Sequence, residues 1–171
     1  MENKVDAHAF MNDQMKAVLA KSAELAGSDA FATDAGFEGM RENYTKERKF
    51  WNEGGPVMAK TVDEMFDGPM GEFKVRFYYP VEAEKLPAIV FIHGGGFVVG
   101  NPDTHDRVCR ILAEKTGAAV VSVDYHLSPE SKYPTNIKEC ALVAKYLHEH
   151  GEEKGIDGED ISFAGDSGGA V

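Results

Sequence analysis

Hydrophobic residues in the first third of the chain recur at spacings of three and four, which is the period of a helix. Over residues 7–26 this pattern predicts an amphipathic helix that ends near Gly27. A second helix is predicted over residues 38–52, and we interpret its aromatic side chains as packing groups rather than ligand contacts. The sequence Gly54-Gly55-Pro56 then closes this helical part of the chain.

After residue 70 the pattern becomes that of strands. Residues 71–80 alternate between apolar and polar side chains, which predicts a half-buried strand that ends at Pro80. Three later segments are continuous apolar runs, the pattern of strands that are covered on both faces. These runs are residues 87–94, 118–125 and 160–167.

Two helices are predicted between these runs. The first spans residues 101–117, with Asp103 or Thr104 as its N-cap and Gly117 at its end. The second spans residues 133–151, with Pro134 near its first turn. The side chains predicted to face inward are Val108, Ile111 and Leu112 in the first helix and Ile137, Ala141, Ala144 and Leu147 in the second.

The order from residue 88 onward is therefore strand, helix, strand, helix, strand. This alternation predicts an α/β fold with a mostly parallel sheet flanked by helices. A length of 171 residues suits one domain. We divide it into a helical segment, residues 1–55, and an α/β core, residues 56–171.

Composition and charge exclude several classes of function. The net charge of −11, from 18 basic and 29 acidic residues, disfavours nucleic acid or an anionic membrane as a partner. The N-terminus lacks the apolar stretch of a signal peptide, and no apolar run approaches the length of a membrane span. Cys109 and Cys140 lie in predicted helices without the spacing of a metal site or disulfide framework. We therefore expect a cytoplasmic protein with buried, reduced cysteines.

The sequence Gly165-Asp166-Ser167-Gly168-Gly169 fits two kinds of nucleophilic serine. It matches the G-x-S-x-G elbow of α/β-hydrolases, and it also matches the GDSGG of chymotrypsin-like proteases. The protease interpretation requires an all-β double barrel with a histidine and an aspartate upstream in suitable settings. The helices predicted around residues 118–125 do not fit a barrel. A strand that leads directly into Ser167 favours the hydrolase elbow.

A second motif, His93-Gly94-Gly95-Gly96, directly follows a predicted buried strand. An ester's tetrahedral intermediate carries an oxyanion, which backbone N–H groups stabilise, and glycines let the main chain approach it closely. The motif could also be a simple glycine-rich turn. A phosphate-binding loop is disfavoured because no Lys-Ser or Lys-Thr pair follows. Together with the serine motif it indicates an esterase oxyanion hole.

With these two motifs, the sequence resembles the hormone-sensitive-lipase family of α/β-hydrolases, and within it the bacterial acetyl esterases. The resemblance runs from about residue 40 to the end. It is carried by HGGGF (93–97), NPDTHDR (101–107), DYHLSPE (124–130), YP (133–134) and FAGDSGG (163–169), and by YTKERKFWNEGGPVMA (44–59) for the esterase subgroup.

The resemblance implies a carboxylesterase that acts on small esters with short acyl chains and needs no metal or cofactor. It implies Ser167 as the nucleophile, with the N-terminal helices forming part of a cap over the acyl pocket. The oxyanion hole is assigned to the backbone of Gly94, Gly95, Gly96 and Gly168, the last three supplying the N–H groups. His93 and Gly94 are expected to shape the loop, and Asp166 to anchor the elbow or the loop.

The sequence departs from the family pattern at three points. His126 replaces the usual arginine, and Gly168 replaces a frequent alanine. In this family the triad Asp and His follow the serine, and nothing follows Val171. We therefore expect an N-terminal portion of an esterase that is inactive or nearly so alone, with residues 161–165 as an exposed apolar edge. The alternative is a non-catalytic esterase-like remnant that binds a partner or is completed by a second chain.

Overall fold

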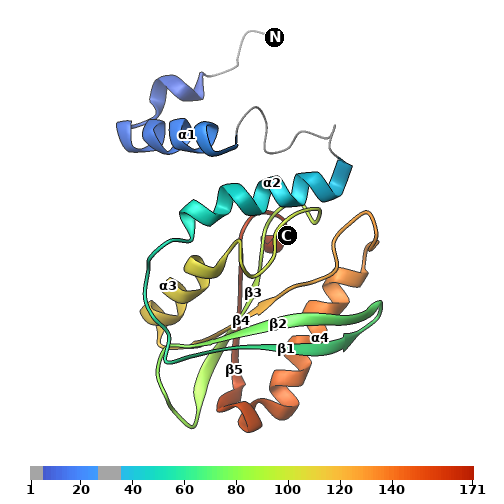
Figure 1. Cartoon of the computed structure of the whole chain (residues 1–171). Coiled ribbons are helices and arrows are strands. Elements are labelled where there is room, and N and C mark those ends of the chain that lie inside the picture. The colour runs from blue at the N-terminus through green and yellow to red at the C-terminus, as the bar shows by residue number, and fades with distance from the viewer. Residues whose placement is uncertain (1–5, 27–35) are drawn as a thin grey trace.

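The computed structural model describes residues 6–26 and 36–171 (Figure 1). One sheet of five strands lies between helices, with the strand order β1-β2-β4-β3-β5. The strands are β1 (Lys60–Gly68), β2 (Gly71–Tyr79), β3 (Leu86–Ile92), β4 (Ala119–Val123) and β5 (Ile156–Gly165). The helices are α1 (Asp13–Ala26), α2 (Gly36–Trp51), α3 (Asp106–Thr116) and α4 (Thr135–His150), with short 3-10 turns η1 (Ala7–Phe10), η3 (Gly151–Lys154) and η4 (Ser167–Ala170).

The sheet is mixed. Strands β4, β3 and β5 are parallel to one another, as the strand-helix alternation predicts. Strand β2 pairs antiparallel with β4, and β1 pairs antiparallel with β2 as a hairpin. The sequence did not predict β1. Its side chains that are at least partly buried are Val62, Glu64 and Phe66, so a charged residue interrupts the apolar side of the strand.

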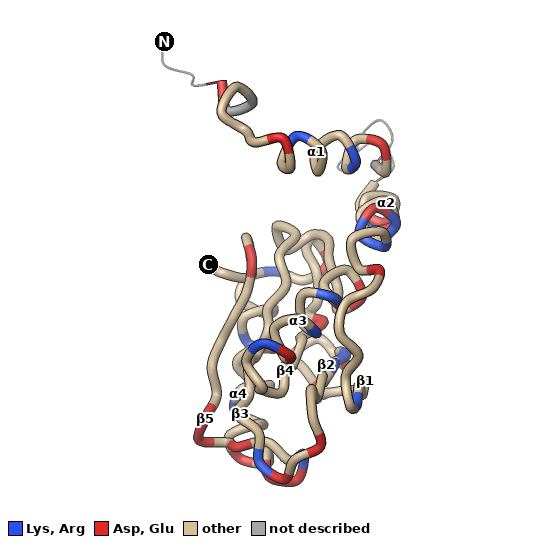
Figure 2. Tube along the Cα trace, turned by 90° about the vertical axis from the view of Figure 1, so that its left-hand side faces the viewer, with Lys and Arg blue, Asp and Glu red and all other residues tan. Residues whose placement is uncertain are grey.

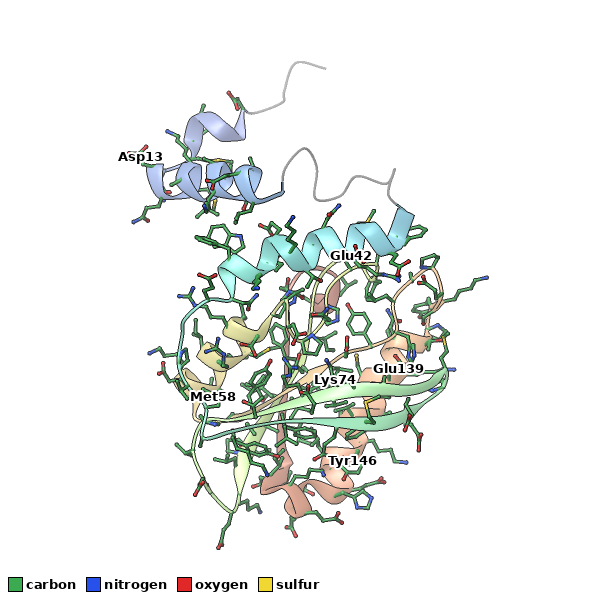
Figure 3. All side chains as sticks on the ribbon, viewed as in Figure 1. Asp13, Glu42, Met58, Lys74, Glu139 and Tyr146 are labelled. Atoms are coloured by element: carbon green, nitrogen blue, oxygen red, sulfur yellow. The ribbon has the colours of Figure 1, made fainter. Side chains whose placement is uncertain are left out.

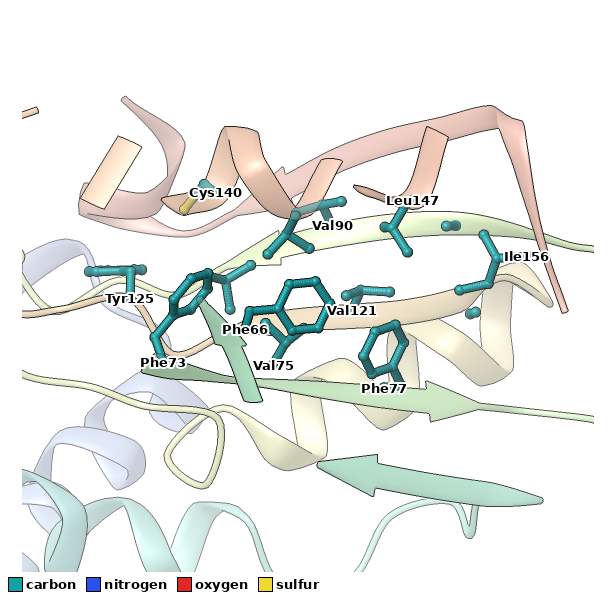
Figure 4. Packing of buried hydrophobic residues seen from close by; sticks show 14 of the residues in the cluster. Phe66, Phe73, Val75, Phe77, Val90, Val121, Tyr125, Cys140, Leu147 and Ile156 are labelled. Atoms are coloured by element: carbon teal, nitrogen blue, oxygen red, sulfur yellow. The ribbon is translucent and has the colours of Figure 1, made fainter. Parts of the chain in front are cut away.

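Two hydrophobic clusters cover the two faces of the sheet. Alternate residues of the central strands, such as Val90 and Val121, face α4 and pack with Val143 and Leu147 (Figure 4). The intervening residues face α3 in a second cluster, which comprises Tyr78, Phe91, Cys109, Ala113 and Val120. Burial of each large apolar side chain stabilises the fold by about 1.5–3 kcal/mol relative to exposure. Both cysteines are buried free thiols, as predicted.

The N-terminal helices lie beyond one end of the sheet. Figure 2 shows α1 on the far side of α2 from the strands. The predicted helix over residues 7–26 is divided, because Asn12 Oδ1 accepts a hydrogen bond from the Met15 N–H (2.8 Å) and caps a new start. Its predicted stop, Gly27, lies outside the described residues. Within the described ranges, no helix is both long and apolar enough to cross a bilayer.

Helix α3 begins later than predicted. Its N-cap is His105, without a side-chain cap bond, whereas Thr104 Oγ1 donates to the Asn101 carbonyl. The predicted cap at Asp103 or Thr104 is therefore wrong, and the predicted end at Gly117 is confirmed by its left-handed φ of 72°. Val108 and Ile111 are exposed rather than inward-facing, because the small residues Cys109 and Ala113 make the close contact with the sheet.

The inward face of α4 also differs from the prediction. Leu147 is buried as expected and Ala144 is partly buried, but Ile137 and Ala141 are exposed. The fully buried Glu139 takes a place on the inward face (Figure 3). Glutamate is usually exposed, so the sequence pattern placed Glu139 on the solvent face of the helix. The predicted inward face was therefore rotated away from the observed one.

Strand β5 was predicted to be covered on both faces, and that prediction is wrong. It lies at the edge of the sheet, and Phe163 is 61% exposed. Its position agrees with the expectation of an exposed apolar edge at residues 161–165. Ser167 follows this strand directly, so the candidate nucleophile stands at the margin of the described structure.

Candidate active site

Ser167 lies in a sharp turn between β5 and η4. It has a φ of 48°, one of two non-glycine residues with positive φ among the described residues. A left-handed conformation costs a residue with a side chain about 1–2 kcal/mol. The Gly169 N–H donates to the Asp166 carbonyl (2.8 Å), which closes the turn. Strain of this kind concentrates at functional positions, and it presents the Ser167 side chain at the end of the strand.

The glycines that flank Ser167 are required by close packing. A Cβ on Gly165 would lie 2.7 Å from the Ile92 carbonyl oxygen, and one on Gly169 would collide with the same carbonyl. Both approaches are closer than real Cβ atoms come to other atoms. The elbow therefore fits directly against the end of β3, where the glycine loop begins.

The glycine loop after β3 lies beside the elbow. Gly95 and Gly96 have φ values of 123° and 59°, which L side chains rarely adopt. The Val98 and Val99 N–H groups both donate to the Gly95 carbonyl (3.1 Å). A Cβ on Gly168 would lie 3.4 Å from the Gly96 nitrogen, so the two backbones are adjacent.

The N–H of Gly94 is already engaged. It donates to Asp166 Oδ1 at 2.8 Å. The inclusion of Gly94 in the oxyanion hole therefore needs correction, since a donor bound to a carboxylate is not available to an oxyanion. This contact agrees with a loop-shaping role for Gly94, and the expectation that Gly95, Gly96 and Gly168 supply the oxyanion N–H groups stays a prediction.

Asp166 joins three segments of the site. Its Oδ1 accepts the Gly94 N–H and lies 3.3 Å from His105 Nε2. His105 Nδ1 in turn lies 2.9 Å from Thr104 Oγ1 at the start of α3. The hydrogen bond from His105, together with that from Gly94, lowers the pKa of the Asp166 carboxyl below its usual value. The carboxylate thus holds the elbow, the glycine loop and α3 together.

His93 is buried beneath the glycine loop. Its ring stacks on Tyr125 with centroids 4.3 Å apart, and its Nδ1 lies 2.8 Å from the Gly94 carbonyl. The Tyr125 hydroxyl donates to the His93 carbonyl (2.7 Å). Burial lowers the pKa of the imidazole to about 4, so the ring is neutral near pH 7. These contacts place His93 as a support of the loop.

The other histidines with described side chains contact groups other than Ser167. His126 Nδ1 lies 2.7 Å from Glu139 Oε1, and the His126 N–H donates to the other oxygen of that carboxylate. His148 contacts the Gly158 carbonyl and His150 contacts Glu153. The side chain of His8 lies outside the described part of the structure. None of the five described rings forms a hydrogen bond with the Ser167 hydroxyl.

A pocket of about 480 Å³ opens between α2 and the glycine loop. Helix α2 contributes apolar side chains and Arg48, whose guanidinium carbon lies 4.8 Å from the centre of the Tyr44 ring. The loop contributes Gly95, Gly96, Val98 and Val99. Ser167 and Asp166 line the floor of this pocket. A small molecule in it would therefore contact the candidate nucleophile.

Comparisons with known proteins support the α/β-hydrolase fold. A family model described as the alpha/beta hydrolase fold matches residues 89–171. The chain is 38% identical over 170 residues to acetyl esterases of Salmonella agona and Salmonella typhi, which covers 99% of this chain and 51% of each relative. The chain thus spans about half the length of these curated relatives.

The solved structures give the same result. A hyperthermophilic esterase from the archaeon Pyrobaculum calidifontis superposes with a TM-score of 0.83 at 36% identity, over 93% of this chain and 50% of that one. A thermostable carboxylesterase cloned from a metagenomic library gives a TM-score of 0.77 at 35% identity, over 81% and 47%. The chain has the α/β-hydrolase fold. Its relatives include bacterial acetyl esterases, and it corresponds to their N-terminal portion.

The sequence predicted the main features of this site and did not predict two of its contacts. Ser167, Gly95 and Gly96 line one pocket, and Gly168 lies next to the Gly96 backbone. His105 was assigned only to a helix start, yet it contacts Asp166. Arg41 of α2 was not singled out, although its guanidinium reaches the carbonyls of Val98 and Ser128. No motif signals such contacts, because they join segments far apart in the sequence.

Proposed function

We propose that Ser167 is the nucleophile of a carboxylic ester hydrolase of the acetyl esterase lineage. The observation that carries the proposal is the strained left-handed backbone of Ser167, on the floor of a pocket that is also lined by Gly95 and Gly96. Strain at a serine that faces adjacent glycine backbones is what the elbow of a serine esterase requires.

The proposed reaction begins with attack of Ser167 Oγ on the ester carbonyl carbon. The carbonyl oxygen becomes an oxyanion, which the N–H groups of Gly95, Gly96 and Gly168 stabilise. A general base takes the Ser167 proton and gives it to the departing alkoxide, so the alcohol leaves and an acyl-serine remains. With the same base, water then hydrolyses the acyl-serine to release the acid and regenerate Ser167. The mechanism uses no metal or cofactor. Asp166 and His93 hold the loop and the elbow in place from below.

A serine hydroxyl needs a base to accept its proton at neutral pH. Since none of the five described histidine rings is hydrogen-bonded to Ser167, we propose that the base and its orienting acid come from polypeptide outside residues 1–171. The 171-residue chain alone is therefore expected to be inactive or nearly so. The N-terminal helices are proposed to form part of a cap, because α2 supplies one wall of the pocket.

The substrate class is proposed to be small esters with short acyl chains. The pocket walls are mainly apolar, with Phe37, Met40, Val98 and Val99 facing the site. A second pocket of about 120 Å³ lies beside Gly168 and is lined mostly by apolar side chains, including Phe97 and Ile137. Its size suits a short chain, which agrees with the acetyl esterase lineage.

Kinetics on the protein at its natural length tests this proposal. We expect hydrolysis of a p-nitrophenyl acetate ester, and a loss of about 10³-fold or more in kcat for Ser167→Ala, since removal of a triad member leaves only the contribution of binding and the oxyanion hole. Ser162→Ala is the matched control, because it removes a hydroxyl from β5, the strand that leads to Ser167. Activity of Ser167→Ala equal to that of the control would contradict the proposal.

A second candidate is a non-catalytic esterase-like protein that binds a partner or is completed by a second chain. The engaged histidines favour it, because no base for Ser167 is provided by the described residues. The mass of the protein isolated from its native source separates the two candidates. A mass near 18.7 kDa together with no esterase activity would support the second candidate.

A further inference from the structure

Arg41 projects from α2 toward the glycine loop and engages two backbone carbonyls. Its Nε donates to the Val98 carbonyl and its Nη2 to the Ser128 carbonyl, each at 2.8 Å. Its two Nη groups also contact the Glu130 carboxylate, at 3.1 and 2.6 Å. One guanidinium thus joins the N-terminal helix, the glycine loop and the segment that follows β4.

The two carbonyls belong to segments that also hold each other. The Ser128 N–H donates to the Phe97 carbonyl at 2.7 Å. Val98, whose carbonyl binds Arg41, donates its own N–H to the Gly95 carbonyl. Val98 therefore connects Arg41 to Gly95 by two hydrogen bonds. Ser128 gives a second connection, from Arg41 to Phe97 of the same loop.

We propose that Arg41 is a positioning residue for ester hydrolysis, which fixes the loop of residues 94–99 so that the Gly95 and Gly96 N–H groups face the Ser167 oxyanion. This inference rests on the proposed function. Arg41 does not line the pocket with Ser167, so it acts through the loop rather than on the substrate.

The carbonyl bonds, rather than the ion pair, carry the positioning. Glu130 is 59% exposed, and exposed ion pairs contribute little. The contacts to Val98 and Ser128 are partly buried, where charge-assisted hydrogen bonds are strong. Only a guanidinium offers several donors in a fixed plane, so it can bind both carbonyls at once.

Helix α2 has a separate hydrophobic attachment to the loop. Met40 and Tyr44 are buried against Val99 in a small cluster. Loss of the Arg41 guanidinium should therefore leave α2 docked and the pocket formed, while the loop gains freedom. A positional error of about 1 Å at a catalytic group can cost about 100-fold in rate.

The test compares Arg41→Met, Arg41→Lys and Glu130→Gln in the protein at its natural length. For Arg41→Met we expect kcat for the p-nitrophenyl acetate ester to fall about 10- to 100-fold while KM changes less than about threefold. Arg41→Lys should be intermediate, since an ammonium can still reach one carbonyl, and Glu130→Gln should stay within about threefold of wild type. Lys46→Met is the matched control, because it removes an exposed charge from the same helix.

Amide hydrogen exchange on the same proteins supplies a readout that is independent of catalysis. We expect the Val98, Val99 and Ser128 amides to exchange about tenfold faster or more in Arg41→Met, while the central amides of Val90 and Val121 keep their wild-type rates. If Arg41→Met does not fold, Arg41→Lys carries the same test.

Two results would overturn the inference. One is a kcat of Arg41→Met within twofold of the control with unchanged exchange in the loop. The other is a loss in Glu130→Gln as large as in Arg41→Met, which would assign the effect to the ion pair. Failure of the proposed function is distinguishable, because Ser167→Ala would then keep its activity, and the exchange experiment would still report whether Arg41 holds the loop.

Discussion

The centre of the sheet and its β5 edge arise from similar sequence patterns and differ in their environment. The apolar runs that form β3, β4 and β5 all predict covered strands, and β3 and β4 are covered on both faces by α3 and α4. Strand β5 leaves Phe163 exposed and carries Ser167 at its end. An apolar run thus reports that a strand forms, but it does not report what covers that strand.

The largest effect on stability is expected from truncation of a central side chain. Phe77 is fully buried between the sheet and α4, so Phe77→Ala should lower the free energy of unfolding by about 3–5 kcal/mol. Phe163→Ala at the edge should change it by less than about 0.5 kcal/mol. Urea unfolding measures both. Equal losses at the two positions would show that β5 is covered in solution.

The buried His93, which follows the central strand β3, should make the free energy of unfolding depend on pH. The folded pKa of about 4 lies below the ordinary 6.5, so the unfolded chain binds a proton that the folded chain does not. The stabilisation is complete above pH 6.5 and is lost as the pH falls toward 4. The difference between the unfolded pKa of 6.5 and the folded pKa of about 4 corresponds to about 3 kcal/mol in the free energy of unfolding.

Urea unfolding at pH 7.0 and 5.0 checks this effect, with His93→Gln as the comparison. The wild-type protein should lose more stability between these pH values than the variant. Asp166 at the edge acts in a different range, because its lowered pKa gives a stabilisation that is lost only as the pH falls below about 3.8. An NMR titration in which the His93 ring of the folded protein protonates near 6.5 would refute this explanation.

The smallest effect on folding stability is expected at the exposed edge itself. Phe163→Lys should leave the free energy of unfolding within about 0.5 kcal/mol of wild type and should reduce self-association of the 171-residue chain, since a charge on an edge strand opposes pairing with another edge. Light scattering over a range of concentrations checks this. Identical scattering by wild type and variant would indicate that the edge is not an association surface.

The sequence predicted the parallel strands, their connecting helices and the two motifs of the site. The sequence pattern failed at elements in which a polar residue is buried and at contacts between residues far apart in the chain. Strand β1 was missed because Glu64 faces inward, and the phase of α4 was misjudged because Glu139 is buried against His126. The contacts of Asp166 with His105 and of Arg41 with Val98 join segments more than 50 residues apart, which local patterns do not report.

The most direct test of the central claim is covalent labelling of Ser167. The protein at its natural length is treated with a fluorophosphonate, which reacts with activated serines, and the modified tryptic peptide is identified by mass spectrometry. We predict one label per chain on Ser167, with no labelling of the Ser167→Ala variant. A label on any other serine, or no label in a preparation that hydrolyses the acetate ester, would contradict the assignment of Ser167 as the nucleophile.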